Sequence, residues 1–343
     1  MNSFGRIFRV TVFGESHGNY VGITIDGCPP GLRITVPDFA EDIDRRRPGA
    51  KGTTPRKEDD IPELITGIFN DSTTGAPLTV LFKNANTRSG DYEKQRAFPR
   101  PGHADFVAHE KFKGFEDYRG GGHFSARITV GIVAAGVIAK KIIASLLPEK
   151  NVSVAAAIIE VGGEPDIERG LQKAIDAKDS VGGILECTVK NLPIGLGEPF
   201  FDSAESLISH AMFAIPAVKG IEFGAGFKAA KMFGSEHNDP IINMDGTTAT
   251  NHAGGIVGGI TNGNDLVFRL VIKPTSSTPK EQQTLNVDTG NVEPFSVKGR
   301  HDLCVALRAP VIVEAMTAIV LADLIMIENS RKGSYTNKPM TNL

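Results

Sequence analysis

Cysteine is scarce in this chain of 343 residues. Its three cysteines, Cys28, Cys187 and Cys304, are odd in number, lie far apart and show no CxxC spacing. Such a set argues against a disulfide framework and against a zinc site. We therefore expect a protein of a reducing compartment, the cytoplasm, with no metal centre.

An excess of positive charge is also missing. The chain carries 37 Lys and Arg against 40 Asp and Glu, which gives a formal net charge of −3. No global positive field is available to hold a nucleic acid backbone or an anionic membrane, so neither partner is expected. Any recognition of an anion must come from a local cluster of cations.

Segments of the membrane-targeting kind are absent as well. Residues 1–14 lack the charged segment and long apolar run of a secretory signal, so we expect no export. The most apolar stretch, residues 128–147, contains Lys140 and Lys141 and is short for a membrane span. It predicts a helix buried inside the protein.

Several well-known catalytic and nucleotide-binding motifs do not occur. The chain has no GxxxxGK phosphate loop, no HExxH and no GxSxG. Gly224, Ala225 and Gly226, followed by Ala229, imitate a dinucleotide fingerprint. They lack a βαβ context and a ribose-binding acid at the right distance, so we predict no dinucleotide site there.

What the chain does contain is an ordinary globular composition, 41% hydrophobic and 22% charged residues, so it is expected to fold. No Pro/Ser-rich linker divides it, which favours one domain over residues 1–330 and a polar tail over 331–343. Hydrophobic periodicity predicts strands at 8–13, 21–26, 181–190 and 266–272, and helices at 37–47, 128–147, 203–213 and 311–326. These elements alone fit an α+β fold or a doubly wound sheet.

One pattern recurs along the chain. A strand at 21–26, a Pro/Gly turn and a helix are followed later by a strand at 181–190, a turn at 192–197 and a helix at 203–213. The two segments share only small and turn residues. They suggest an internal duplication, with chance similarity as the alternative.

The strongest local feature is the run RGGGHFSAR at residues 119–127, directly before the apolar helix. Three glycines let backbone N–H groups approach a ligand closely, and the helix N-terminus adds its positive dipole end. Arg119 and Arg127 add groups for bidentate contact. The run predicts an anion or cofactor loop, and a glycine hinge is the alternative.

Two histidines lie in glycine-containing turns, His17 in GESHG and His103 in PGHAD. Because histidine titrates near neutral pH, the pair suggests acid–base chemistry, although each alone could be a surface residue. The run 45–47 is three consecutive arginines that either clamp an anion or cap their helix. Arg300, His301 and Asp302 form a third loop of mixed charge, or a plain surface turn.

In this order, GESHG, DRRRPG, RPGHAD, RGGGHFSAR, NHAGGI, KPTSS and GRHD span nearly the whole chain, and together they resemble the chorismate synthase family. The resemblance implies a single α+β domain with helices sandwiched between antiparallel sheets, assembled as a homotetramer. It also implies conversion of 5-enolpyruvylshikimate 3-phosphate to chorismate, in the shikimate pathway of aromatic amino acid biosynthesis. That reaction is an anti 1,4-elimination of phosphate that requires reduced FMN without net redox change.

The resemblance also assigns roles by matching positions. His17 would keep the reduced flavin correctly protonated, His103 would assist departure of phosphate, and Asp302 would work with flavin N5 in removing the C6 proton. The expected substrate contacts are Ser16, Arg45, Arg46, Arg119, Ser125 and Arg127, and Arg46 is the candidate contact for NADPH as a reductant. The expected FMN contacts are His123, Phe124, Ser125, Pro216, Ala217, Gly258, Lys273, Pro274, Thr275, Ser276, Ser277 and Arg300.

Three residues depart from the family pattern. Many members read RGGGRSSAR, so His123 and Phe124 remove a fixed charge and a hydroxyl from the cofactor loop, and Pro216 replaces a frequent asparagine. Two alternatives remain from the residues. One is an NAD(P)H-dependent flavin reductase, and the other is a non-enzymatic module that binds anions or RNA.

Overall fold

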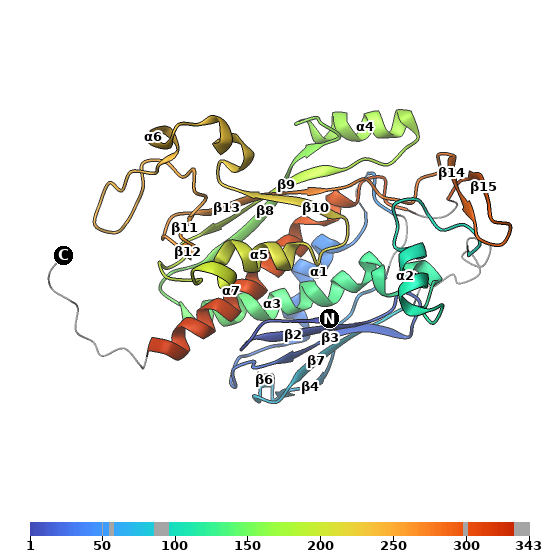
Figure 1. Ribbon diagram of the computed structural model, residues 1–343. Helices are drawn as coiled ribbons and strands as arrows, with labels where there is room; N and C mark the ends of the chain where they lie inside the picture. The colour runs from blue at the N-terminus through green and yellow to red at the C-terminus, as the bar shows by residue number, and fades with distance from the viewer. Residues whose placement is uncertain (50, 55–57, 86–95, 298–300, 333–343) are drawn as a thin grey trace.

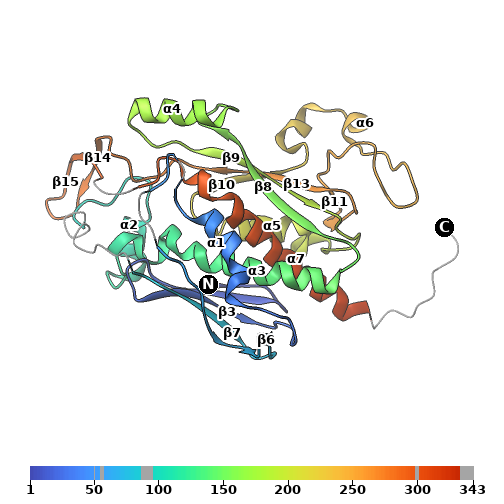
Figure 2. The same cartoon turned by 180° about the vertical axis from the view of Figure 1, so that it is seen from behind.

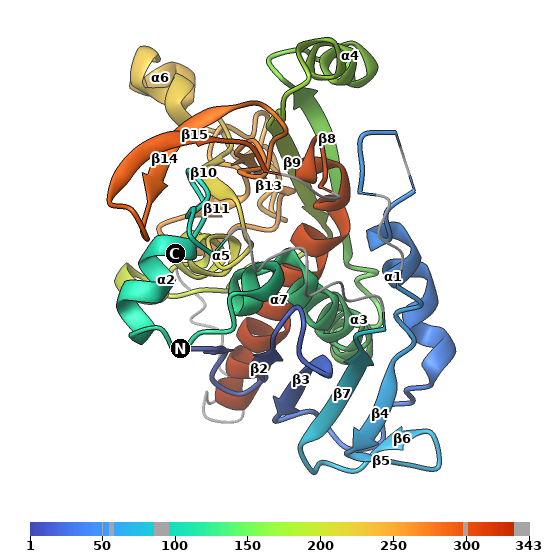
Figure 3. The same cartoon turned by 90° about the vertical axis from the view of Figure 1, so that its right-hand side faces the viewer.

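The protein is built in layers, with a helical layer between two antiparallel sheets, as Figures 1 and 3 show. This computed structural model describes residues 1–49, 51–54, 58–85, 96–297 and 301–332. One sheet lies below the helices in Figure 1 and the other above them, and helix α4 covers the outer face of the upper sheet. The predicted α+β class is thereby confirmed.

The two sheets come from different halves of the chain. The first has the order β1-β2-β3-β7-β4 and the second β10-β13-β9-β8, with antiparallel neighbours throughout. The first sheet comprises β1 (Ser3–Phe4), β2 (Arg9–Gly14), β3 (Tyr20–Asp26), β7 (Leu78–Lys83) and β4 (Glu63–Thr66). The second comprises β8 (Ser153–Val161), β9 (Gly183–Lys190), β10 (Val218–Phe223) and β13 (Leu266–Ile272). Three short hairpins complete the strands of the described residues: β5 (Ile68–Phe69) with β6 (Ser72–Thr73), β11 (Ile256–Val257) with β12 (Ile260–Thr261), and β14 (Gln282–Asn286) with β15 (Asn291–Phe295).

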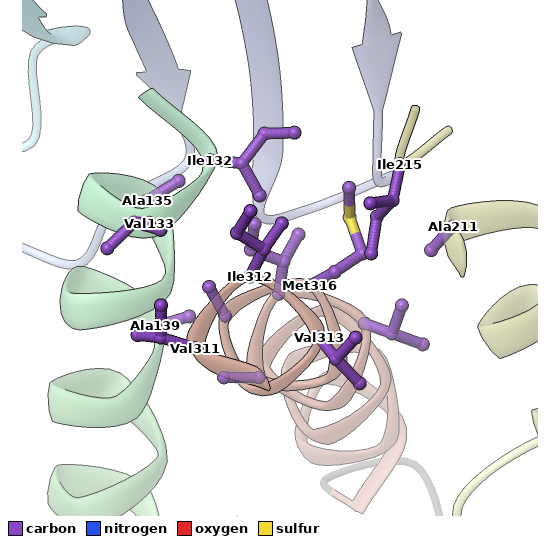
Figure 4. Close-up of a cluster of buried hydrophobic side chains, with 14 of the residues drawn as sticks. Ile132, Val133, Ala135, Ala139, Ala211, Ile215, Val311, Ile312, Val313 and Met316 are labelled. Atoms are coloured by element: carbon purple, nitrogen blue, oxygen red, sulfur yellow. The ribbon is translucent and has the colours of Figure 1, made fainter. Parts of the chain in front are cut away.

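The central helices are α3 (Thr129–Leu146) and α7 (Pro310–Lys332), and the shorter helices α1 (Ala40–Arg46) and α5 (Ala204–Met212) pack beside them. Figure 4 shows aliphatic side chains of α3, α5 and α7 meeting between the sheets. A glycine sets their spacing. A Cβ on Gly136 of α3 would lie 2.3 Å from the Cβ of Ala315 on α7, so the two backbones approach as closely as small residues permit.

Burial follows the pattern of the sequence. Buried and partly exposed residues alternate along β9 and β13, because one face of their sheet packs on the helices. Helix α3 is buried almost all round, as its uniformly apolar sequence predicts. The segments 126–146 and 310–331 are long and apolar enough to cross a membrane by composition alone, but 78% and 83% of their most apolar windows are buried inside the protein.

The two halves share one topology. In each half a first and second strand pair directly, a helix follows the second strand, and the sheet order is first-second-fourth-third (β2-β3-β7-β4 and β8-β9-β13-β10). A long core helix, α3 or α7, follows the fourth strand each time. Strands β3 and β9 thus occupy equivalent places, as the recurring sequence pattern predicts, and the topology supports the duplication.

A buried carboxylate anchors the start of β2. Asp323 on α7 accepts hydrogen bonds from the backbone N–H groups of Arg6, Ile7 and Phe8 at 2.8–3.0 Å, and its side chain is buried. We expect Asp323→Ala to lower the free energy of unfolding by about 1–3 kcal/mol, because the buried N–H of Phe8 loses its partner while the less buried N–H groups of Arg6 and Ile7 can turn to water. Urea unfolding measures this. Asp26→Ala, at the exposed end of β3, is the control, and an equal loss there would contradict the anchoring role.

Some elements differ from the sequence-based expectation. Helix α7 extends six residues beyond the predicted end at 326 and takes in Arg331 and Lys332, which were assigned to the tail. Strands β4, β7, β8 and β10, the hairpins, and helices α2 (Asp105–Phe112), α4 (Ile167–Ala177) and α6 (Gly234–His237) were not predicted. Residues 333–343 lie outside the described residues.

Candidate active site

The glycine run forms a tight turn that begins at Arg119 and ends at the helical layer. Gly120, Gly121 and Gly122 all have positive φ, at 59°, 80° and 49°. This conformation is open to glycine and strained for other residues. Ser125 then accepts a hydrogen bond from the backbone N–H of Arg127 at 3.2 Å and starts the helical turn that leads into α3.

His17 packs directly against the first of these glycines. It follows β2 and is buried, and the backbone N–H of Ser16 donates to the carbonyl of Gly122 at 3.1 Å. A Cβ on Gly120 would lie 2.3 Å from Cε1 of His17 and 2.4 Å from Nδ1. The β2–β3 turn and the glycine loop therefore fit together only because Gly120 has no side chain.

His103, in the PGHAD turn, packs against the second glycine of the run, Gly121. A Cβ on Gly121 would lie 3.1 Å from Cε1 and 3.3 Å from Nε2 of His103. Its Nδ1 lies 2.6 Å from Oδ1 of Asp105, and Arg100 binds the same carboxylate through Nε and Nη2 at 2.7 and 2.8 Å. Burial raises the pKa of Asp105, but the hydrogen bonds from Arg100 and His103 outweigh it and hold that pKa well below its usual value.

The KPTSS loop joins this group through Arg100. Its Nη1 donates to Oγ of Ser277 at 3.2 Å. Nζ of Lys273 donates to Oγ of Ser276 at 2.6 Å and to the carbonyl of Gly102 at 2.8 Å. Burial, with a smaller effect of Lys219, lowers the pKa of Lys273. The predicted cofactor loop and His103 therefore share one hydrogen-bonded network.

The cofactor segment at 216–217 lies beside this loop. The backbone N–H of Lys273 donates to the carbonyl of Ala217 at 2.9 Å. Ala217 has a φ of +72°, which is strained for a residue with a Cβ and is typical of binding sites. The hydroxyl of Thr275 is buried without a hydrogen-bond partner among the described residues, so it can accept or donate to a ligand.

Behind the glycine loop lies a buried cluster of charges. Asp60 binds Nη1 of Arg127 and lies 3.4 Å from Nη1 of Arg46, and all three side chains are buried. Arg46 also donates to the hydroxyl of Thr129 at 3.0 Å and to the carbonyl of Ala126 at 3.0 Å. Burial first, and then the charge of Arg308, lower the pKa of Arg46 to about 9. A guanidinium stays charged at neutral pH. The lowered pKa therefore means that the positive charge of Arg46 is only partly compensated and that a further anion would stabilise the cluster.

Asp302 belongs to the edge of the same cluster. It accepts a hydrogen bond from the backbone N–H of Thr54 at 2.8 Å and lies 3.2 Å from Nη1 of Arg308, whose Nε donates to the carbonyl of Arg46. Among the described residues, Arg46, Arg127 and Arg308 face two carboxylates, Asp60 and Asp302, which leaves one surplus positive charge. A small cavity bounded by Ala126, Thr129, Pro216 and Arg308, among others, connects this cluster with the cofactor segment.

Other predicted substrate arginines have protein partners. Arg45 forms a bidentate ion pair with Glu314 at 2.6 and 2.7 Å, which ties α1 to α7. Arg119 binds both oxygens of Asp117 at 2.8 Å with its side chain partly exposed. These hydrogen bonds are the main cause that lowers the pKa of Asp117. Substrate contacts from Arg45 and Arg119 stay predictions, and such contacts would require these pairs to open.

Three comparisons with known proteins agree. The sequence model of one family, described as chorismate synthase, matches residues 8–326. The chorismate synthase of Chitinophaga pinensis is 66% identical over 337 residues, 98% of this chain and 100% of the relative, and that of Dehalococcoides mccartyi is 46% identical over 353 residues, 94% and 96%. A solved structure titled "Crystal Structure of Chorismate Synthase" is 25% identical with a TM-score of 0.73, and the match covers 95% of this chain and 93% of the other. The chain belongs to the chorismate synthase family.

As a member of the chorismate synthase family it is an enzyme, a carbon–oxygen lyase. The residues that the family resemblance assigns to FMN do not all lie close to one another within this chain. His123 lies 3.2 Å from Oδ1 of Asn2 and, with Phe124, lines a cavity of about 1370 Å3 that also reaches His103 and Gly121. This cavity is larger than the usual pocket for a single ligand, so it has enough volume for a ligand beside the glycine loop.

Gly258 is the exception. Its hairpin β11–β12 packs against Ser203 and Ala204, at the end of β13 opposite to Lys273. Figures 1 and 2 show the β11–β12 hairpin at the far end of the protein from α2 and the hairpin β14–β15. An FMN contact from Gly258 within the same chain as Lys273 is not compatible with this placement. Arg300 lies outside the described residues.

Arg46 also departs from one expectation. Because it is buried and its guanidinium is hydrogen-bonded inside the protein, it offers no exposed group to NADPH in this conformation. Sequence reasoning missed four functional candidates, Asp60, Arg308, Arg100 and Asp105. The last two stand inside the RPGHAD motif, so their signal was present, but Asp60 meets partners 14 and 67 residues away and has no local signal.

Proposed function

We propose that this protein converts 5-enolpyruvylshikimate 3-phosphate to chorismate by anti 1,4-elimination of phosphate, with reduced FMN as its cofactor. The proposal rests on how three groups are arranged around the glycine loop. His17 and His103 both pack on the glycine loop, and a buried cluster with surplus positive charge lies behind that loop. A substrate with a phosphate and two carboxylates needs such a preorganised cationic environment.

The chain's own groups suit the steps of this elimination. Arg308, whose side chain is partly exposed, would contact an anionic group of the substrate, and the buried Arg46 and Arg127 would attract that group through their charge. His103, at the wall of the large cavity, would donate a proton to the departing phosphate. Asp302, beside Arg308, would accept the proton from C6, and its carboxylate stays partly exposed at the edge of the cluster.

The residues expected around FMN fit such a group. The unpartnered hydroxyl of Thr275, the cation of Lys273 and the strained backbone at Ala217 offer a hydroxyl, a charge and exposed backbone to an anionic cofactor. Reduced FMN, when bound, supplies electron density to the elimination and is regenerated at its end. His17, buried against Gly120, would hold the proton that the reduced form requires.

An anaerobic assay tests the function directly. With reduced FMN and the phosphorylated enolpyruvyl substrate, we expect chorismate and phosphate to appear in equal amounts. Absence of both products would overturn the proposal. Oxidation of NADPH with FMN alone would instead indicate a flavin reductase, and salt-dependent RNA binding without phosphate release would indicate a non-enzymatic module.

We also propose that the chain works as a cytoplasmic homotetramer, with NADPH as a reductant of its flavin left as a secondary proposal. Exposed aromatic side chains beside the β11–β12 hairpin support the assembly, since Phe200 and Phe201 are 86% and 93% exposed and Val257 is 59% exposed. Such a patch, next to Gly258, suits contact with a second copy. Light scattering tests the assembly, and a monomer at working concentration would contradict it.

A further inference from the structure

A carboxylate lies behind His103 in a position that controls its ring. Nδ1 of His103 and Oδ1 of Asp105 are 2.6 Å apart, and neither atom can be a bare acceptor toward the other at that distance. Nη2 of Arg100, which can only donate, also lies 3.1 Å from Nδ1, but the carboxylate is the nearer partner and accepts the stronger bond. A proton must therefore lie between Nδ1 and Oδ1. Because hydrogen bonds from Arg100 and His103 keep Asp105 ionised, as the lowered pKa of that carboxyl indicates, the proton belongs to Nδ1.

The other ring nitrogen faces the reaction site. Nε2 of His103 lies 3.3 Å from the position that a Cβ on Gly121 would take, at the wall of the large cavity. We propose that Asp105 is a positioning residue that holds a proton on Nδ1 of His103, so that Nε2 is the atom that takes up a proton, giving an imidazolium stabilised by Asp105, and then donates that proton to the departing phosphate. This inference deepens the proposed function and rests on it for the role of Nε2.

Arg100 completes the arrangement, because it orients the carboxylate. Its backbone N–H and its Nε both donate to Oδ2 of Asp105, at 3.1 and 2.7 Å, while Nη2 donates to Oδ1 at 2.8 Å. Nη1 reaches Ser277 of the KPTSS loop at 3.2 Å. The ring of His103 is thus tied through Asp105 and Arg100 to the loop expected to hold the cofactor.

The same contacts decide how an amide would sit at this position. In Asp105→Asn, two donors of Arg100, the backbone N–H and Nε, converge on the Oδ2 position, whereas only Nη2 reaches the Oδ1 position. The amide oxygen keeps more hydrogen bonds at Oδ2, so the amide NH2 takes the Oδ1 position, loses the bond from Nη2 and donates to Nδ1 of His103. Asp105→Asn is therefore expected to invert the tautomer of His103 to Nε2–H, with nearly the same shape.

Two measurements on the full-length protein test this. Magic-angle-spinning NMR with 15N-labelled histidine, at a pH where the ring is neutral, reports which nitrogen carries the proton, and His103→Gln assigns its signal among the eight histidines. We expect Nδ1–H in the unaltered protein and Nε2–H in Asp105→Asn. A proton on Nε2 in the unaltered protein, or no inversion in the variant, would overturn the proposal whatever the enzyme's activity.

Turnover provides the functional readout. Asp105→Asn should lower kcat by about 100-fold or more, the usual range of general acid–base effects, with little change in KM. Glu116→Gln is the matched control, because Glu116 also pairs with Nδ1 of a histidine, His109, at 3.1 Å near the same helix. It should leave kcat unchanged. An inverted tautomer with undiminished kcat would remove His103 Nε2 from the reaction and leave the proposed elimination itself intact.

Discussion

Gly120→Ala is expected to lower turnover by about 100-fold or more, the order of loss that a displacement of about 1 Å at a reacting group produces. The added methyl group would lie 2.3 Å from Cε1 of His17 and 2.9 Å from Oγ of Ser16. Neither neighbour can remain in place, because His17 is buried and its loop is held by the backbone bond from Ser16 to Gly122. Steady-state kinetics under reducing conditions measures the loss.

Backbone strain alone must be separated from this collision. Gly163 provides the control, since its φ of +79° is also positive but a Cβ there would meet nothing within 4 Å. Gly163→Ala carries the strain of a left-handed residue without a displaced histidine, so its turnover should stay near that of the parent. Equal losses in the two variants, or full activity of Gly120→Ala, would contradict a role for the fit between His17 and the loop.

The sequence predicted the elements whose signals are local. Strands β3, β9 and β13 and the helices α3 and α7 have strong periodicity or a long apolar run, and each was expected close to its observed bounds except at the C-terminal end of α7. Helix α4 was missed although its signals were present. Asp166 caps it, accepting from the backbone N–H of Arg169, and its apolar residues recur at helical spacing.

The site was predicted in part for the same reason. His17, His103 and the glycine run stand in recognisable turns, so they were found as separate motifs, but their contact with one another depends on how β2 packs beside the loop. Arg46 and Arg127 were predicted as contacts for a ligand. Their burial around Asp60 could not be predicted, because a carboxylate without a motif gains its meaning only from tertiary partners.

That carboxylate gives the largest expected effect on stability. Asp60→Asn should lower the free energy of unfolding by about 3–5 kcal/mol, because it leaves Arg46 and Arg127 buried without their counter-charge. The backbone is not the cause, since the φ of +48° at Asp60 is a conformation that asparagine also adopts. Urea unfolding measures the change. Asp44→Asn, which removes the partner of Arg47 at an exposed ion pair, should cost only about 0–1 kcal/mol.

Anions distinguish this explanation from a general loss of packing. With Asp60 neutralised the cluster carries one more uncompensated positive charge, so inorganic phosphate should stabilise Asp60→Asn more than it stabilises the parent protein. Thermal unfolding at constant ionic strength, with chloride replaced by phosphate, isolates this effect. If phosphate raises the Tm of both proteins equally, the buried arginines are not the groups that bind the anion, and the assignment of Arg46, Arg127 and Arg308 to the substrate's charges fails with it.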